Sequence, residues 1–201
     1  MGQYYRALTE NKKDGQRVWS IQTVEWRETV DRGEKDYGLY NGIKLTEHSW
    51  IGNDFMVGIS EYLYKNPTHV AWVGDYSDTD AWGNVNSVDY RSLHERAWNT
   101  IEEVDAQKSN FDVRHKFLVN HTKKTFVDFD DYIEKSTTED GWCLHPLSLL
   151  TACGNGLGGG DFHKTTTSIG NENVGRWGFD EISIEDEAPS GYTKEDITFK
   201  E

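Results

Sequence analysis

The chain has 201 residues, which is enough for one domain with a full hydrophobic core or at most two small domains. Hydrophobic residues make up only 35% of it, yet eight Trp, ten Tyr and eight Phe supply large apolar side chains. This aromatic content indicates a folded protein rather than a disordered one. The net charge of −14, from 35 acidic against 21 basic residues, repels nucleic-acid phosphates and argues against direct DNA or RNA binding.

The acidic charge has two interpretations. One is solubility, which surface charge commonly provides. The other is a surface that imitates nucleic acid and occupies a basic partner protein. The acids lie in short groups along the chain, at 102–103, 128–131 and 185–187, and this spread weakens the second interpretation without removing it.

The sequence contains no recognisable targeting or membrane segment. The N-terminal MGQYYRALTE lacks the apolar core of a signal peptide, and Arg6 stands where a myristoylation pattern needs Ser or Thr. No run approaches the roughly 18 apolar residues of a membrane span. Two cysteines, Cys143 and Cys153, do not make a disulfide framework. We therefore expect a cytoplasmic protein with reduced thiols and no membrane contact.

The first predicted elements are two strands. Residues 3–9 (QYYRALT) and 16–24 (RVWSIQTVE) are rich in aromatic and β-branched types, and the polar NKKDG between them suits a hairpin turn. Residues 27–42 are charged and contain glycine, which indicates a loop after this hairpin.

An amphipathic helix is predicted at 54–66. Asn53 is a suitable N-cap, and Pro67 ends the pattern. The segment HVAWVG at 69–74 then indicates a short buried strand. The apolar face of the helix consists of Phe55, Ile59, Tyr62 and Leu63.

The middle of the chain predicts a second helix and a second hairpin. Residues 75–87 form a polar stretch typical of a loop, and the pattern at 89–104 is that of a helix with one apolar face. The apolar runs at 116–120 and 125–129 flank HTKK, which suits a four-residue hairpin connection.

The C-terminal part is less regular. The apolar run at 142–150 fits either a strand or a short helix, and the alternation at 176–186 offers Phe179, Ile182 and Ile184 as strand residues. The tail YTKEDITFKE predicts a last edge strand. Hairpins with two or three interspersed helices predict an α+β fold, in which helices pack on an antiparallel or mixed sheet within a single domain of all 201 residues.

The most unusual stretch is TACGNGLGGGDFHKT, at 151–165. Its GNGLGG satisfies the dinucleotide-binding pattern G-x-G-x-x-G, but that pattern needs a helix that begins at the last glycine. Three consecutive threonines, 165–167, favour extended chain instead. The Walker pattern is absent because no glycine directly precedes Lys164, and the calcium-binding nonapeptide would need repetition.

A looser mechanism remains for this stretch. Glycines let backbone N–H groups approach a ligand and form an anion nest, and nearby basic side chains can add positive charge. We therefore expect a small anionic, nucleotide-like ligand here; the alternatives are a mobile surface loop or tight backbone packing. Trp72, Trp82 and Trp177 can stack a base or belong to the core. The expected ligand-binding residues are Gly154, Asn155, Gly156, Gly158, Gly159, Gly160, Asp161, His163, Lys164 and Arg176.

Two metal patterns are incomplete. Cys143, His145, Cys153 and His163 have the ligand count of a zinc site, but their spacing matches no usual zinc motif. The segment that begins at Asp78 resembles the start of a calcium loop, yet it has Trp where an oxygen ligand belongs and ends in Asp rather than a bidentate Glu. We expect no metal and no cofactor.

Catalysis has weak support in the sequence. Either cysteine can pair with a nearby histidine, but no local signature accompanies such a pair. His48 lies beside Glu47, and a carboxylate can hold a histidine as a general base. His163 with Asp161 is a similar combination. A lone histidine is more often structural, so a His-dependent hydrolase is the second alternative to binding.

Several phrases resemble a group of uncharacterised proteins from Gram-positive bacteria and their phages. They are GIKLTEHSWIGNDF, HVAWVGDYSD, FLVNHTKKTFVDFDDY, HPLSLLTACGNGLGGGDF and VGRWGFDEISIEDE. The resemblance spans about residues 1 to 200 and implies one domain. It implies no activity and no site residues, because none is established for the group. The phage association suggests a role against a host defence system.

Two hypotheses of different kinds follow. The first is a soluble binding protein for the small anionic ligand described above. The alternative is an acidic inhibitor that occupies a basic, nucleic-acid-handling host protein. Their partners differ accordingly, a small ligand in one case and a host protein in the other. The sequence leaves the oligomeric state open.

Overall fold

The structure is a computed structural model that describes most of the chain. The described residues are 2–9, 19–23, 43–76, 103–106, 110–162 and 169–200, with only the backbone described in 19–23 and 103–106. Several predicted segments lie outside them: the NKKDG turn, the loop at 27–42, most of the loop at 75–87 and residues 89–102 of the second predicted helix.

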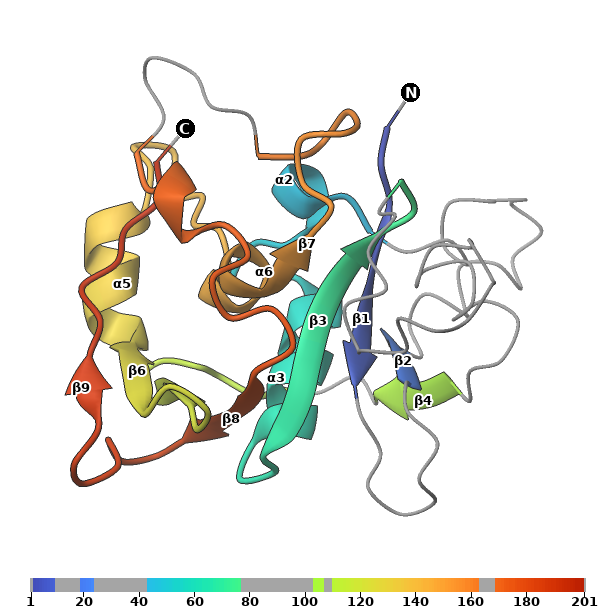
Figure 1. The fold of residues 1–201 in the computed structure, drawn as a ribbon. Coiled ribbons are helices and arrows are strands. Elements are labelled where there is room, and N and C mark those ends of the chain that lie inside the picture. The colour runs from blue at the N-terminus through green and yellow to red at the C-terminus, as the bar shows by residue number, and fades with distance from the viewer. Residues whose placement is uncertain are drawn as a thin grey trace.

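One sheet runs through the molecule, in the order β4-β2-β1-β3-β8-β5-β6-β9, with β7 paired to β3 (Figure 1). The strands are β1 (Tyr5–Thr9), β2 (Trp19–Thr23), β3 (Thr68–Gly74), β4 (Glu103–Ala106), β5 (Phe117–Asn120), β6 (Thr125–Asp128), β7 (Ala152–Cys153), β8 (Glu181–Glu185) and β9 (Thr193–Lys194).

The sheet is mixed. β1 pairs antiparallel with β2 and β3, and β5 pairs antiparallel with β6 and β8. The pairs β2–β4, β3–β7 and β6–β9 are parallel. Together with the helices below, this confirms the predicted α+β class with a mixed sheet.

Both predicted strand pairs are present. In the first, Leu8 lies opposite Ser20. In the second, β5 and β6 are joined by the four residues 121–124, as the HTKK segment predicted. The predicted edge strand of the tail is the short β9, which ends the sheet beside β6.

Two strand predictions need correction. Glu103 and Val104 were expected to end a helix, but they begin β4, because the parallel pairing with β2 outweighs their helical pattern. Phe179 was expected in a strand but lies before it, since β8 begins at Glu181. Phe179 instead has a left-handed backbone, with φ of 68°, and its amide N–H bonds to the carbonyl oxygen of Val70.

The described residues contain four α-helices, where two or three were expected. They are α2 (Leu45–His48), α3 (Asp54–Leu63), α5 (Phe129–Ser136) and α6 (Pro146–Thr151), with a 3₁₀ turn at Asn171–Asn173. α2 and α5 were not predicted. α5 begins at an N-cap, because the Asp128 carboxylate accepts hydrogen bonds from the amides of Asp130 and Asp131. Lys135, in the last turn, places a positive charge at the negative end of the helix dipole, which stabilises the helix.

α3 confirms the predicted helix but is shorter. Its N-cap is Asn53, whose side chain accepts from the amide of Phe55 at 3.0 Å. The helix ends at Leu63 rather than at residue 66. The amide of Lys65 bonds instead to the carbonyl oxygen of Ile184 in β8. Figure 1 shows α3 running behind β3.

The ambiguous run at 142–150 resolves into an extended end and a helix. Leu144 makes an isolated bridge to Trp50, and α6 then begins with Pro146 at its first position. Proline suits that position because its missing N–H has no partner in a first turn. His145 caps the helix, as its ring nitrogen Nδ1 accepts from the amide of Leu147 at 3.1 Å.

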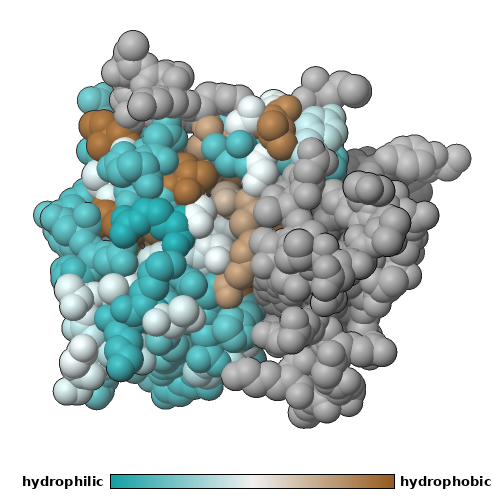
Figure 2. All heavy atoms as spheres, in the orientation of Figure 1, coloured by the Kyte–Doolittle hydropathy of each residue, from teal (hydrophilic) through white to brown (hydrophobic). Residues whose placement is uncertain are grey.

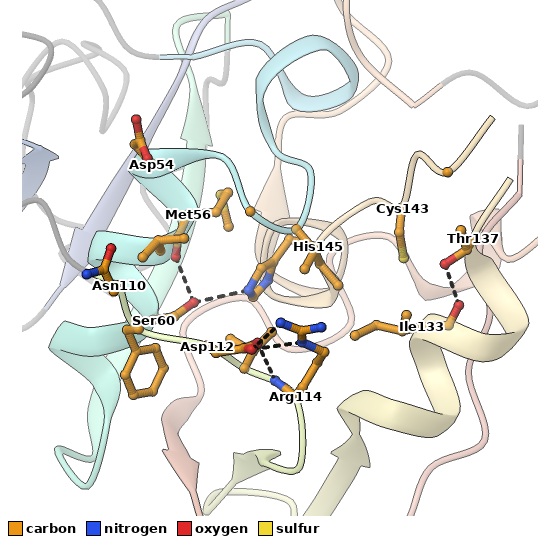
Figure 3. A pocket seen from close by; sticks show the side chains of 16 residues that line it. Asp54, Met56, Ser60, Asn110, Asp112, Arg114, Ile133, Thr137, Cys143 and His145 are labelled. Atoms are coloured by element: carbon orange, nitrogen blue, oxygen red, sulfur yellow. Dashed lines mark hydrogen bonds and ion pairs between the residues drawn. The ribbon is translucent and has the colours of Figure 1, made fainter.

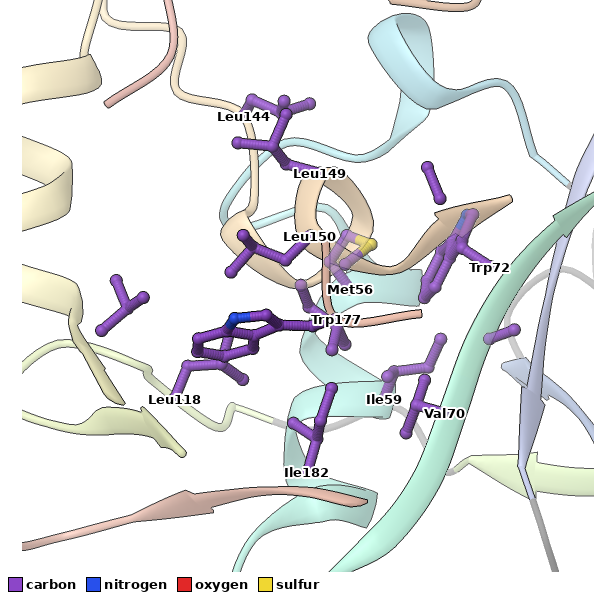
Figure 4. Packing of buried hydrophobic residues seen from close by; sticks show 14 of the residues in the cluster. Met56, Ile59, Val70, Trp72, Leu118, Leu144, Leu149, Leu150, Trp177 and Ile182 are labelled. Carbon is purple, nitrogen blue, oxygen red and sulfur yellow. The ribbon is translucent and has the colours of Figure 1, made fainter. Parts of the chain in front are cut away.

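The core lies between α3, α6 and the sheet, around Trp72 and Trp177 (Figure 4). Both indoles are fully buried, so neither can stack on a ligand as one interpretation of the sequence allowed. Phe55 meets Trp72 edge to face, with ring centroids 5.8 Å apart. Trp82 lies outside the described residues.

The coloured part of the face in Figure 2 is largely hydrophilic, with a few brown hydrophobic spots and a pale-brown band along its border with the grey atoms. Among the described residues, the exposed large hydrophobic side chains are Trp50, Leu157 and Ile169. In the part of the chain that the structure describes, no helix has both the length and the apolar character that a membrane crossing requires.

Candidate functional site

The glycine-rich stretch after β7 folds around a carboxylate of its own. The amides of Gly156, Leu157 and Gly158 donate to Oδ2 of Asp161, at 2.8, 2.9 and 2.9 Å. Asp161 is 1% exposed. The three N–H groups therefore form the nest that the glycines suggested, and the side chain of Asp161 occupies it.

A reciprocal pair closes the same loop. The side-chain amide of Asn155 donates to the carbonyl oxygen of Phe162 at 2.9 Å, and the amide N–H of Phe162 donates to Oδ1 of Asn155 at 2.7 Å. This places Asn155 in the frame of the loop rather than at its surface. Gly154 and Gly156, which take left-handed backbones with φ of 79° and 88°, allow the turn between them.

The last glycines serve close packing. Gly158 lies against Gln3, where an added Cβ would stand 2.7 Å from the backbone nitrogen of Gln3. The carbonyl oxygen of Gly159 accepts from the amide of Gln3 at 2.9 Å, and that of Gly160 accepts from the amide of Thr46 at 3.1 Å. The loop is thus pinned to the N-terminus and to α2.

Of the basic side chains expected at the loop, the structure describes only Arg176, and it is bonded to other partners. The Arg176 guanidinium is held by Oδ1 of Asn173 at 2.8 Å and by Oε2 of Glu195 at 3.1 Å. His163 and Lys164 lie outside the described residues. The structure therefore brings together the glycines, Asn155 and Asp161, and directs Arg176 to other partners.

The ionisable side chains beneath the loop, Tyr5 and Asp75, resist taking a negative charge. Burial raises the pKa of Tyr5 far above its usual range, and the Asp161 carboxylate adds to that effect. Burial likewise raises the pKa of Asp75, with a smaller contribution from Asp161. An incoming anion would meet these carboxylates, so the surroundings of the loop disfavour one.

A cleft of about 610 Å³ lies elsewhere, between α3, residues 110–114 and the segment from α5 to the start of α6 (Figure 3). Met56, Val57 and Ser60 of α3 contribute one wall. The opposite wall contains Ile133, Thr137, Cys143 and His145, and the connecting segment adds Asn110, Asp112, Val113 and Arg114.

Ser60 and His145 are both buried and meet behind the wall of the cleft, with Oγ and Nε2 3.1 Å apart. Because Nδ1 of His145 accepts from the Leu147 amide, the neutral ring carries its proton on Nε2 and donates it to Ser60. The Ser60 hydroxyl in turn donates to the carbonyl oxygen of Met56 at 2.7 Å. His145 thus acts as a donor to Ser60 and not as its base.

Burial fixes this protonation state. His145 is 1% exposed, and desolvation lowers the pKa of its ring to about 3. The imidazole is therefore neutral near pH 7. The ring of Phe129 packs edge to face against it, with centroids 5.4 Å apart, which also holds its orientation.

The mouth of the cleft is charged. Nε of Arg114 donates to Oδ2 of Asp112 at 2.8 Å, and the same carboxylate accepts from the amide of Arg114 at 3.0 Å. The guanidinium holds the pKa of Asp112 below its usual range, so this carboxylate is ionised near neutral pH. Asp54, in the first turn of α3, adds a second exposed carboxylate to the lining.

The other candidate chemistry finds no assembled site among the described residues. Cys143 and Cys153 are free thiols, and burial raises the pKa of both, to about 12 for Cys153. No group of three or more His, Cys, Asp or Glu side chains suited to a metal forms in the described part of the chain. Glu47 pairs with Lys44 at 2.7 Å, and Nδ1 of His48 accepts from the Lys44 amide.

Sequence reasoning did not single out the cleft. Ser60 and His145 are 85 positions apart, and Arg114 lies in a stretch without a motif. One local signal was available, because a histidine directly before Pro and an apolar run is in position to cap a helix. That signal identifies the structural role of His145 and not its position in a cleft.

No family model, no curated protein and no solved structure matches this chain. The resemblance to the proteins of Gram-positive bacteria and their phages therefore stays a prediction. The candidate function rests on the geometry of the cleft.

Proposed function

We propose that this protein binds a small organic ligand in the cleft between α3, residues 110–114 and the segment that joins α5 to α6, and performs no reaction on it. The observation that carries the proposal is a cleft of about 610 Å³ whose polar groups are fixed before a ligand arrives. Clefts of roughly 300–1,000 Å³ with mostly apolar walls and a few placed polar groups are typical small-molecule sites. The Arg114–Asp112 pair at the mouth provides such fixed groups, and the buried Ser60–His145 pair supports the wall behind it.

The cleft is a better candidate than the glycine loop. Three amides of the loop are bonded to Asp161, so a ligand there would have to displace a buried carboxylate. Binding in the cleft requires no such exchange. Pre-formed polar groups lower the ordering cost of binding, which favours the cleft further.

Hydrogen-bond directions argue for binding rather than hydrolysis. A nucleophilic serine needs a neighbouring base that takes its proton. Here the Ser60 proton is bonded to the Met56 carbonyl oxygen, and the facing nitrogen of His145 already carries a proton. The pair therefore positions groups and does not activate the hydroxyl.

The inhibitor alternative has less support from the charges that the structure describes. Asp186 is paired with Lys65 and Lys116, at 2.7 and 2.8 Å, and Asp131 of α5 is paired with Lys135 and Lys194, at 3.0 and 3.2 Å. Basic side chains thus interrupt these acidic groups. A continuous acidic face would be the signature of a nucleic-acid mimic.

A blocked cleft tests the proposal. Val57 lines the cleft on α3 and is partly exposed, so Val57→Trp fills the space without removing a fixed polar group. Ile169→Trp is the matched control, because Ile169 is 53% exposed and lies outside the cleft lining. Both proteins are compared with the unsubstituted chain in a ligand-observed NMR screen of small fragments that covers amines, acids and neutral compounds.

We expect fragments that bind the unsubstituted protein and the Ile169→Trp variant but not the Val57→Trp variant. Loss of binding in both variants would indicate a general effect of added tryptophan. The proposal is wrong if no fragment binds, or if every hit binds Val57→Trp as well as it binds the unsubstituted protein.

A further inference from the structure

Apolar side chains from separate parts of the chain reach the open surface of the cleft. They are Ile51, Val57 of α3, Phe111 and Ile133 of α5. All four are partly exposed, and all but Val57 also pack against the hydrophobic core. Apolar surface thus converges on one space, where a bound ligand would remove it from water.

The other apolar lining residues are buried and carry no charge. Met56 and Val113 belong to the core, and Cys143 is a free thiol whose pKa is raised by burial, so it is neutral near pH 7. Figure 3 shows Ile133 extending from α5 toward the opposite wall. A ligand that enters between these walls meets mainly carbon and sulfur atoms.

The hydroxyls of the lining have partners inside the protein. Ser60 is fully buried, and both of its hydrogen bonds are internal. The Thr137 hydroxyl donates to the carbonyl oxygen of Ile133 at 2.6 Å and also contacts the Cys143 thiol. Both hydroxyls are therefore satisfied before a ligand arrives.

Each charged side chain in the described lining also has a partner. Nε and a terminal nitrogen of Arg114 lie 2.8 and 2.6 Å from Oδ2 of Asp112. The two charges of this pair cancel, and water solvates both side chains, which are 67% and 49% exposed. Asp54 has an interaction of its own. A charged ligand would have to break a pair, or lose water without gaining a counter-charge.

We infer that the ligand is neutral and mainly apolar, a hydrocarbon or an aromatic or aliphatic alcohol, and neither a cation nor an anion. The exposed amide of Asn110, which is uncharged, can bond to one neutral polar group of such a ligand. This inference rests on the proposed function, since it names the chemical class that the same cleft takes. It departs from the anionic ligand that the glycine pattern suggested.

Three probes with one body and different end groups test the class. They are 2-phenylethanol, 2-phenylethylamine and 3-phenylpropionate, titrated into the full chain at pH 7 and followed by protein-observed NMR. We expect the alcohol to bind about tenfold more tightly than either charged probe, because only the charged groups lose hydration without a free partner. Val57→Trp should abolish alcohol binding, and Ile169→Trp should leave it unchanged.

Two substitutions at the mouth test whether paired charges exclude charged ligands. Asp112→Asn leaves Arg114 without its counter-charge but keeps an acceptor for the Arg114 amide, so 3-phenylpropionate should bind roughly three- to fivefold more tightly. Arg114→Gln leaves Asp112 unpaired and should favour 2-phenylethylamine by a similar factor. Alcohol binding should stay the same in both variants. If neither charged probe gains affinity, pairing is not what excludes charge from the cleft.

The outcomes separate the inference from the proposed function. A charged probe that binds as tightly as the alcohol, at a site that Val57→Trp blocks, would overturn the neutral class and leave a ligand-binding cleft. If no probe binds but the fragment screen yields hits that Val57→Trp abolishes, mostly neutral hits support the inference and mostly charged hits overturn it. If neither experiment finds binding that depends on Val57, both ideas are wrong.

Discussion

The glycine loop and the cleft use hydrogen bonds in opposite ways. In the loop, three backbone donors converge on Oδ2 of Asp161, so these three N–H groups are satisfied without a ligand. At the cleft, the buried Ser60 and His145 use their donors internally, and an open space of about 610 Å³ lies in front of them. The loop stabilises itself, whereas the cleft keeps capacity for a partner.

This difference shows that a conspicuous composition and an available site are separate properties. Glycine gives a backbone the freedom to form a nest, but it does not determine what fills the nest. The count of donors and acceptors that are already bonded decides whether a ligand has a place. Three predictions test the contrast, the first two on the loop and the third on the cleft.

The largest expected effect is at Gly158. A Cβ there would stand 2.5 Å from Cβ and 2.7 Å from the backbone nitrogen of Gln3, so Gly158→Val must push the N-terminus away from the loop. We expect the free energy of unfolding to fall by about 3 kcal/mol, measured by urea denaturation.

Gly156→Ala is the matched control for that substitution. Gly156 has a φ of 88°, and a Cβ added to it would meet open space, so only backbone strain opposes alanine. The cost should be about 1 kcal/mol. Equal effects at both positions would mean that the loop is loose and that close packing does not explain its glycines.

Asp161→Asn should have the next largest effect. It removes the charge that three amides bind and places a buried N–H₂ group near them, which should cost about 2 kcal/mol of unfolding free energy. Phosphate should not stabilise the unsubstituted protein, since the nest is filled. The opposite result would be that inorganic phosphate raises the melting temperature of the unsubstituted protein and that Asp161→Asn changes this rise. That would show that the loop exchanges its carboxylate for an anion.

The sequence predicted the features that depend on neighbours along the chain. The N-cap at Asn53, the hairpin around residues 121–124 and the edge strand at the tail are local patterns, and all three are present. The end of α3 was misplaced because a contact with β8 terminates it. Glu103 and Val104 form a strand for the same kind of reason, since β2 is their partner.

The glycine loop and the cleft also differ in whether their key residues are neighbours along the chain. The role of Asp161 was within reach of the sequence, because an aspartate directly after a glycine run is well placed to accept hydrogen bonds from nearby amides. The cleft was not, since Ser60, Asp112 and His145 come from separate elements. Only the packing of α3 against α6 brings the serine and the histidine together.

The effect that is smallest near neutral pH, and the most specific, concerns the buried histidine beside the cleft. Burial lowers the pKa of His145 to about 3, so the unfolded chain, with an ordinary histidine, takes up a proton first as pH falls. The contribution of this residue to stability is therefore complete above about pH 6.5 and is lost progressively toward pH 3, at up to about 1.4 kcal/mol per pH unit.

His145→Asn keeps an N-cap acceptor but removes the titrating ring. Acidic residues such as Asp112 also destabilise the fold on protonation, so the informative quantity is the difference between the two proteins. Urea denaturation from pH 7 to pH 4 should give a shallower loss of unfolding free energy in His145→Asn. Parallel curves would mean that His145 is accessible to water and protons in the folded protein, and that its fixed hydrogen bond to Ser60 does not hold.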